Sequence, residues 1–197
     1  MQSLKRVQRE VRELAASKDL AQGGLTVEVV DGNLSHLHGY LRGPADSPYD
    51  GACLQLDIEI PENYPFSPPV CKFITRIWHP NISSQTGVIC LDVLKENWAA
   101  TMTIRTVLLS IQALLTVPEP KDPQDAVVAS QYMKNPALFN RTARFWAQHF
   151  AEGPGEKEKE LQLKVSKLCE MGVDRDTVIS QLSYVDWDLD RAIANIF

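Results

Sequence analysis

Residues 78–98 read WHPNISSQTGVICLDVLKENW, and this stretch decides both the fold and the candidate chemistry of the chain. Proline disfavours the helical conformation in the residue before it, so His79 is predicted to lie on extended or turn backbone. The polar run 83–87 (SSQTG) predicts a loop. Cys90 therefore follows a turn and lies close in sequence to Asn81 and His79, a position compatible with thiol chemistry.

The residues around Cys90 leave several interpretations open. A cysteine between two apolar neighbours is typical of a small buried hydrophobic residue. A protease-like Cys–His pair would need a histidine free to accept a proton and a third group to orient it, and such partners usually lie far away in the sequence. A closed zinc site is not expected, and neither a metal nor a cofactor is predicted. The reason is that no short Cys-x-x-Cys spacing occurs among Cys53, Cys71, Cys90 and Cys169.

The same stretch resembles the active-site segment of ubiquitin-conjugating enzymes. In that family His-Pro-Asn is followed, nine residues after the asparagine, by a cysteine in an [IV]-C-L-D sequence. Asn81 and Cys90 have this spacing, and Ile89, Leu91 and Asp92 match the pattern. The resemblance covers nearly the whole chain. It is strongest to members of the chain-building, huntingtin-interacting type, which carry an added ubiquitin-associated (UBA) domain.

The resemblance implies an α+β ubiquitin-conjugating fold, a four-stranded antiparallel meander with helices, followed by a small three-helix UBA bundle. The catalytic domain is expected at residues 1–150, a linker at 151–159 and the UBA domain at 160–197. Glycine, proline and mixed charge in the expected linker agree with this division.

Residue patterns predict the same elements independently. Alternation of apolar and polar residues, interrupted by Gly, Pro and Asp, predicts strands at 25–30, 34–40, 53–60 and 70–75, with one face of the sheet exposed to solvent. Apolar residues at helical spacing predict helices at 3–17, 103–115, 125–133 and 136–150. Three shorter amphipathic helices are predicted at 161–170, 175–182 and 189–197.

Bulk properties restrict the classes of function. The 197 residues carry 20 Lys and Arg against 25 Asp and Glu, a net charge of −5. Such a balance argues against general nucleic-acid binding, which depends on cations that neutralise phosphates. Unpaired cysteine spacing favours a cytosolic or nuclear location with reduced thiols. Neither a signal peptide nor a membrane span is expected, because no apolar run is long enough.

By resemblance, Cys90 accepts the C-terminus of ubiquitin as a thioester and passes it to a lysine amine. Asn81 is the candidate donor to the oxyanion, or else it braces the active-site loop. Asp122 is expected beside the mouth of the site, where it receives the attacking lysine within a partly apolar gate. His79 belongs to the same catalytic segment, and we expect it to hold the turn by hydrogen bonds and not to act as a base.

The resemblance also places partner surfaces. The expected partners are ubiquitin, an activating enzyme and RING-type ligases, with no nucleic acid and no membrane. The residues expected to contact the activating enzyme and the ligase are Lys5, Arg6 and Arg9 on the first helix, Phe66 in the proline-rich run 61–69, and Ala99 with Ala100. The residues expected to bind ubiquitin in the UBA domain are Met171, Gly172, Val173 and Ile196.

Two other functions compete with this interpretation. A conjugating enzyme for a ubiquitin-like modifier would share the fold, but an added UBA domain favours ubiquitin itself. A noncatalytic ubiquitin-binding adaptor would also share the fold, but such variants lack the active cysteine. Cys90 therefore favours the enzyme.

Overall fold

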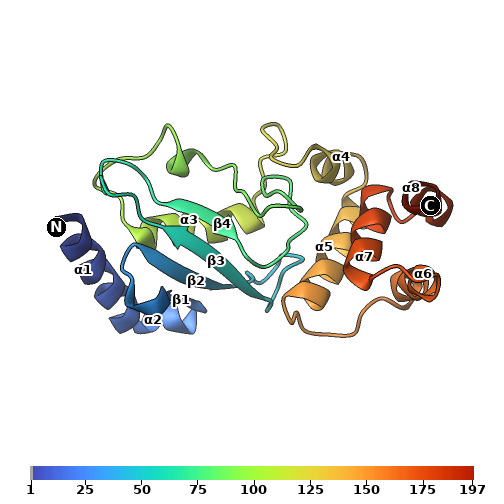
Figure 1. The fold of residues 1–197 in the computed structure, drawn as a ribbon, viewed down its shortest axis with the longest axis horizontal. Coiled ribbons are helices and arrows are strands. Elements are labelled where there is room, and N and C mark those ends of the chain that lie inside the picture. Colours follow the sequence, from blue (N-terminus) through green and yellow to red (C-terminus); the bar gives the residue numbers. More distant parts are fainter. Residues whose placement is uncertain (1) are drawn as a thin grey trace.

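A four-stranded antiparallel sheet, with its strands in the order β1-β2-β3-β4, forms the centre of the computed structural model, which describes residues 2–197 (Figure 1). Each strand pairs with its neighbour in sequence, so the predicted meander is confirmed. The second strand begins at His36 instead of residue 34, because the Asn33 side chain accepts a hydrogen bond of 3.0 Å from the Ser35 amide and forms a turn. The strands are β1 Leu25–Val29, β2 His36–Arg42, β3 Cys53–Glu59 and β4 Val70–Phe73.

The helices of the first 150 residues begin where polar side chains cap them. Thr103, Asp125 and Asn135 accept hydrogen bonds from amides in the first turns of α3, α4 and α5. The short helix α2, which was not predicted, begins after Ser17 and is too brief for a periodic pattern to reveal it. The helices are α1 Gln2–Ala16, α2 Lys18–Gln22, α3 Ile104–Thr116, α4 Ala126–Lys134 and α5 Pro136–Phe150.

One face of the sheet packs on α3 and the other face is open. Alternate residues of β3, such as Leu54 and Leu56, are buried, whereas Gln55 and Asp57 between them are partly exposed. At the close approach of α3, a Cβ added at Gly39 would lie 3.2 Å from a methyl carbon of Leu108, a tighter contact than is usual. The predicted solvent-exposed face is therefore confirmed.

A buried carboxylate fastens α1 to the rest of the fold. Glu10 is 3% exposed and accepts hydrogen bonds from the Arg6 guanidinium at 2.8 Å, the Tyr64 hydroxyl at 2.8 Å and the Ile104 amide at 2.9 Å. Burial, and next the hydrogen bond to Glu10, raise the pKa of Tyr64, so its hydroxyl stays a donor at physiological pH. The proline-rich run 61–69 and the start of α3 thus meet at one side chain of α1.

The last 39 residues form three helices, α6 Lys159–Glu170, α7 Arg175–Tyr184 and α8 Leu189–Ile196. Of these, α7 lies beside α5, with α6 and α8 on the far side of α7 (Figure 1). Their apolar residues continue the hydrophobic core of the first 150 residues. The Trp146 indole of α5 donates to Ser183, and the Trp187 indole donates to Thr142 of α5, both at 2.9 Å. A bundle this small has a marginal core of its own, so these shared contacts contribute to its stability.

The segment between α5 and α6 is held along α5. The Cys53 amide donates to the carbonyl of Ala151 at 2.7 Å, and the Gln148 side chain donates to the carbonyls of Pro154 and Glu156. Fixed backbone of this kind differs from the free tether that glycine, proline and mixed charge usually form.

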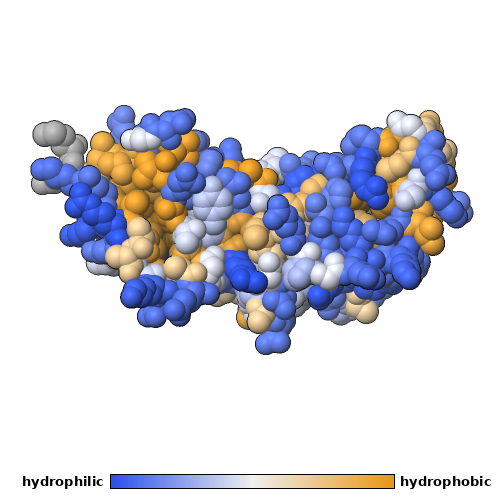
Figure 2. Space-filling model, turned by 90° about the horizontal axis from the view of Figure 1, so that it is seen from below, coloured by the Kyte–Doolittle hydropathy of each residue, from blue (hydrophilic) through white to orange (hydrophobic). Residues whose placement is uncertain are grey.

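The surface is mostly hydrophilic between two apolar regions. In the view of Figure 2, hydrophobic residues gather at the α1 end of the molecule, and a smaller group lies at the C-terminal bundle. Among residues 2–197, no helix combines the length and the hydrophobicity that a membrane crossing requires.

We predict that Glu10→Ala lowers the free energy of unfolding by about 3 kcal/mol, because it leaves the Tyr64 hydroxyl and the Ile104 amide without their buried acceptor. Urea titration followed by tryptophan fluorescence measures the effect. Glu13→Ala is the matched control on the same helix. Glu13 is exposed and lies 3.7 Å from Arg9, so its loss should cost less than about 0.5 kcal/mol. Equal costs for the two variants would contradict the anchoring role of Glu10.

Candidate active site

A tight turn presents Cys90 at the surface beside β4. The Gly87 amide donates to the Ser83 carbonyl, and the Ser83 amide donates to the Val88 carbonyl, both at 2.9 Å, so the predicted loop at 83–87 is confirmed. Gly87 has φ +75°, and a Cβ there would lie 2.0 Å from the Phe73 carbonyl oxygen, so no other residue fits. The chain then runs past the buried Ile89 into Cys90.

Two charged side chains flank the Cys90 thiol. The thiol donates to the Asp122 carboxylate at 3.5 Å, and the Lys95 ammonium donates to the sulfur at 3.3 Å. The hydrogen bond to Cys90 and the attraction of its sulfur raise the pKa of Lys95, so this ammonium stays charged beside the thiol. The sulfur is partly exposed, which excludes the buried-hydrophobe interpretation.

The contact of Lys95 with the Cys90 sulfur was not predicted from the sequence. Lys95 follows Cys90 by five residues, and the short 3-10 helix Asp92–Leu94 brings it back to the sulfur. No residue pattern predicts that return. Cys71 differs from Cys90 in its environment. It is buried, and burial raises the pKa of its thiol to about 12.

Within the part of the chain that the structure describes, the side chain of Asn81 forms hydrogen bonds only with the loop that carries Asp122. Its side-chain amide donates to the carbonyls of Glu119 at 2.8 Å and Asp122 at 2.9 Å, and its oxygen accepts from the Glu119 amide at 2.8 Å. An amide group has two N–H donors, and both are used. Of the two roles considered for Asn81, the geometry therefore favours bracing the loop over donating to an oxyanion.

His79 lies beneath the site and holds the turn. It is fully buried, accepts the Asn81 amide on Nδ1 at 3.0 Å, and donates from Nε2 to the Leu114 carbonyl at 3.0 Å. Burial, only partly opposed by the Leu114 hydrogen bond, lowers the pKa of His79 to about 4. The ring is neutral at physiological pH with both nitrogens engaged, as expected for a residue that positions the turn.

The loop around Asp122 is open to solvent. Asp122, Glu119 and Lys121 are all exposed, so the partly apolar gate expected for the attacking lysine is not formed by this chain alone. The loop is nevertheless fixed in place. The Asp122 amide donates to the Glu119 carbonyl at 3.2 Å, and the Pro80 carbonyl accepts the amides of Gln124 and Asp125.

A chain of hydrogen bonds joins the C-terminal bundle to this region. The Tyr184 hydroxyl at the end of α7 lies 2.6 Å from the Ser84 hydroxyl, which donates to the Asp125 carboxylate at 2.5 Å. Asp125 is also the residue that caps α4. The bundle is thus connected to the turn before Cys90 and to the end of the loop that carries Asp122.

The residues expected at the partner surfaces lie at one end of the first 150 residues, where α1 contacts the loops that carry Phe66 and Ala99. On α1, Lys5 and Arg9 are exposed, whereas Arg6 is engaged, since its guanidinium bonds Glu10 and the Met102 carbonyl. Phe66 is 81% exposed. The Trp98 indole donates to the Pro65 carbonyl at 2.8 Å and so brings the exposed Ala99 and the half-buried Ala100 beside the loop of Phe66.

The residues expected to bind ubiquitin in the C-terminal bundle are divided by their exposure. Met171, at the end of α6, is 50% exposed, and Gly172 beside it has φ +91°. Val173 and Ile196 are half-buried against the core of the bundle. An apolar surface therefore exists at the loop after α6, with Met171 as its most exposed member.

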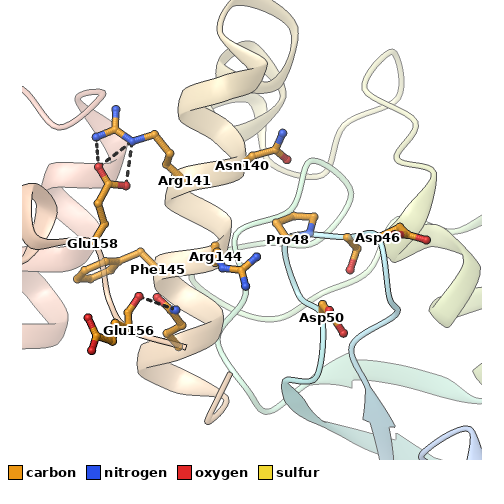
Figure 3. Close-up of a pocket in the computed structure, with 11 residues that line it drawn as sticks. Asp46, Pro48, Asp50, Asn140, Arg141, Arg144, Phe145, Glu156 and Glu158 are labelled. Carbon is orange, nitrogen blue, oxygen red and sulfur yellow. Dashed lines mark hydrogen bonds and ion pairs between the residues drawn. The ribbon is translucent and has the colours of Figure 1, made fainter. Parts of the chain in front are cut away.

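A polar cavity of about 510 Å³ lies away from Cys90, between the loop 46–50, α5 and the segment before α6 (Figure 3). Figure 3 shows Asp46 and Asp50 on one side and Arg144 on the other. The Arg141 guanidinium forms ion pairs with Glu158 and Glu160, which hold the start of α6 at α5. This cavity marks the attachment of the bundle and has no residue in common with the site at Cys90.

A partly exposed thiol on a turn, placed beside an antiparallel meander packed on α3, defines the ubiquitin-conjugating class of fold and site. The family model described as "Ubiquitin-conjugating enzyme" matches residues 6–147, so the chain belongs to the ubiquitin-conjugating enzyme family. It is a transferase of the thioester-forming kind, and its general partners are ubiquitin, an activating enzyme and ligases.

Named relatives extend the match beyond the catalytic domain. "Ubiquitin-conjugating enzyme E2 K" of Homo sapiens is 52% identical over 190 residues, which cover 96% of this chain and 94% of that protein. "Ubiquitin-conjugating enzyme E2 21" of Caenorhabditis elegans is 48% identical over 99% of this chain and 91% of its own length. Among solved structures, a putative ubiquitin-conjugating enzyme from Plasmodium yoelii aligns with a TM-score of 0.73 at 49% identity, covering 78% of this chain and 98% of that chain. The suspected huntingtin-interacting type is thereby confirmed.

We predict that the buried His79 makes the fold less stable in mild acid. Its pKa is about 4 in the folded chain and about 6.5 when unfolded. The unfolded chain therefore binds the extra proton first, and stability contributed by neutral His79 is lost as the pH falls from about 6.5 towards 4. Between pH 7.5 and pH 5 this loss should be about 2 kcal/mol.

Urea unfolding at the two pH values measures the loss, and His79→Gln should reduce the difference. A ring NMR signal of His79 that titrates near pH 6.5 in the folded protein would contradict this account.

Proposed function

We propose that Cys90 is the residue that carries ubiquitin. The observation that supports this assignment is the partly exposed sulfur with Lys95 and Asp122 within 3.5 Å. In the charging step the Cys90 sulfur attacks the thioester carbonyl of ubiquitin bound to the activating enzyme, and the thiol of the activating enzyme leaves. The Lys95 ammonium stabilises the negative charge of the attacking sulfur.

In the second step a lysine amine attacks the Cys90 thioester, and an isopeptide bond forms as the sulfur leaves. Neutralising a free lysine costs about 4–5 kcal/mol at pH 7, because its ordinary pKa is near 10.4. We assign to the Asp122 carboxylate the task of orienting the amine and accepting its proton. Since the gate is exposed, desolvation of the amine depends on the bound ubiquitin and the substrate covering it.

Asn81 acts in this proposal as a positioning residue. Both of its amide N–H groups bond the loop that carries Asp122, and its own backbone carbonyl accepts the Cys90 amide at 2.8 Å. Asn81 thereby sets the separation between the sulfur and the carboxylate. A fixed separation raises the rate by holding amine and thioester together, in place of a strong general base.

We further infer that the enzyme builds polyubiquitin chains and that residues 160–197 are a UBA domain that binds ubiquitin through the surface at Met171. The identity to E2 K proteins over nearly the full chain and the three-helix form of the bundle support this inference. An acceptor ubiquitin held by the bundle would be delivered to the same molecule that carries the thioester, which raises its effective concentration.

RING-type ligases are the proposed ligase class. The exposed Phe66 beside Ala99 supports an aromatic docking site there, and the exposed Lys5 and Arg9 support contact with the activating enzyme on α1. All four cysteines are free, which supports a reducing compartment, and we propose a cytosolic or nuclear location.

We predict that Cys90→Ser accepts ubiquitin as an oxyester and stops turnover, because an alkoxide leaves an ester far less readily than a thiolate leaves a thioester. Incubation with activating enzyme, ATP and ubiquitin, followed by electrophoresis with and without thiol, measures both products. The wild-type adduct should be cleaved by thiol, and the variant adduct should survive it. Cys53→Ser, at an exposed cysteine outside the site, is the control and should charge normally. Chain formation by Cys90→Ser at the wild-type rate would refute the assignment.

We predict that Asp122→Asn charges normally and slows discharge onto free lysine by about tenfold to a hundredfold at pH 7. The defect should shrink at high pH, where more of the lysine is already neutral. Single-turnover discharge across the pH range measures both effects. Glu96→Gln removes a charge from an exposed residue of the same region that does not bond the thiol, and it should leave the profile unchanged. A pH profile for Asp122→Asn that parallels the wild type would remove Asp122 from the reaction.

A further inference from the structure

Three potential metal ligands meet on the open face of the sheet. His36 and His38 alternate along β2 and project from the same face, and Asp57 is the residue of β3 paired with His38. One ligand atom from each of the three residues lies within 4.8 Å of the others. His36 Nε2 lies 2.6 Å from the Asp57 carboxylate. All three side chains are partly exposed, so an ion has access from solvent.

We propose that His36, His38 and Asp57 bind Zn²⁺, with water completing a four-coordinate site. Two imidazoles and one carboxylate are a donor set that suits zinc. Ligand atoms about 2.0–2.1 Å from a tetrahedral ion are roughly 3.3 Å apart. All three pairs of atoms lie within 4.8 Å, so side-chain rotations alone can bring them to this spacing, with the His36–Asp57 pair opening from 2.6 Å. The backbone needs no change, because strand register already fixes the three positions.

Gln55 is placed to orient His38. Its side-chain amide nitrogen lies 3.2 Å from His38 Nδ1. Rotation of the amide group by half a turn brings its oxygen to this position. Nδ1 then donates its proton to Gln55, and Nε2 is left free for the ion. Metal-binding histidines commonly donate their second ring N–H to an oxygen in this way. Gln55 is therefore a positioning residue of the site.

Lys72 competes with the ion. Its ammonium lies 3.5 Å from the second oxygen of Asp57, on the neighbouring strand β4. Repulsion between the ammonium and Zn²⁺ weakens the site, and loss of the ammonium should strengthen it. The site is separate from Cys90 and does not depend on the conjugating activity.

Long-range ¹H–¹⁵N NMR of the imidazole rings, during titration of the full chain with ZnCl₂, tests the proposal. The chain has four histidines, which give internal references. The ring signals of His36 and His38 should change together at one Zn²⁺ concentration, while those of buried His79 stay fixed. Zinc bound by cysteine thiols elsewhere would leave both β2 histidines unchanged, and that result would overturn the proposal.

Variants decide between a metal site and a chance cluster. His38→Gln and Asp57→Asn should each weaken Zn²⁺ binding, read from the signals of His36, by at least about tenfold. Lys72→Ala should tighten binding, an effect that a merely structural ion pair would not produce. His149→Gln is the matched control, because His149 also pairs with an aspartate, Asp176 at 2.9 Å, but belongs to no such cluster within residues 2–197. Equal Zn²⁺ affinity for wild type and His38→Gln, in variants whose backbone spectra show an intact fold, would contradict the site.

Discussion

The hydrogen bonds of Asn81 are the constraint on which the geometry at Cys90 depends. This buried residue forms five of them, which join the His79 turn, the Cys90 amide and the loop of Glu119 and Asp122. Only the His79 turn is next to Asn81 in sequence. Cys90 lies nine residues further along the chain, and the loop of Glu119 and Asp122 lies about forty residues further. Because a buried amide that loses its partners is costly, the three segments are held in one arrangement. The distance between sulfur and carboxylate is a consequence of that arrangement.

This arrangement fixes the positions of the groups around Cys90 and does not provide a strong base. His79 has both ring nitrogens engaged and a pKa near 4, so it cannot take a proton from an incoming amine at neutral pH. The groups bonded to the sulfur, Lys95 and Asp122, are exposed to water, which weakens their electrostatic effect. Ubiquitin joined to Cys90 as a thioester and a bound substrate would exclude that water, and this would strengthen the electrostatic effect of both groups.

Much of the fold is predictable from sequence because its signals are local. The helical spacing of apolar residues in α3 and the alternation of apolar and polar residues in β3 predicted these elements, and the spacing of Asn81 and Cys90 indicated the site. Of two features that were missed, one depends on contacts between distant residues and the other on a short turn that no residue pattern reveals. The sequence around Glu10 does not distinguish it from an exposed helix residue, because its partners Tyr64 and Ile104 lie far away along the chain. Lys95 reaches the sulfur through the short 3-10 helix Asp92–Leu94.

The C-terminal bundle cannot be treated as an independent appendage of the catalytic domain. Trp146 and Trp187 donate across the boundary from buried positions, so separating the two parts would leave indole N–H groups and apolar surface to be resolvated. The Tyr184 hydroxyl continues the connection through Ser84 to the Asp125 cap. Since the Pro80 carbonyl accepts the Asp125 amide, this path of hydrogen bonds continues from α7 to the turn that precedes Cys90 and to the end of the loop that carries Asp122. The bundle therefore contributes hydrogen bonds to the segments that shape the site.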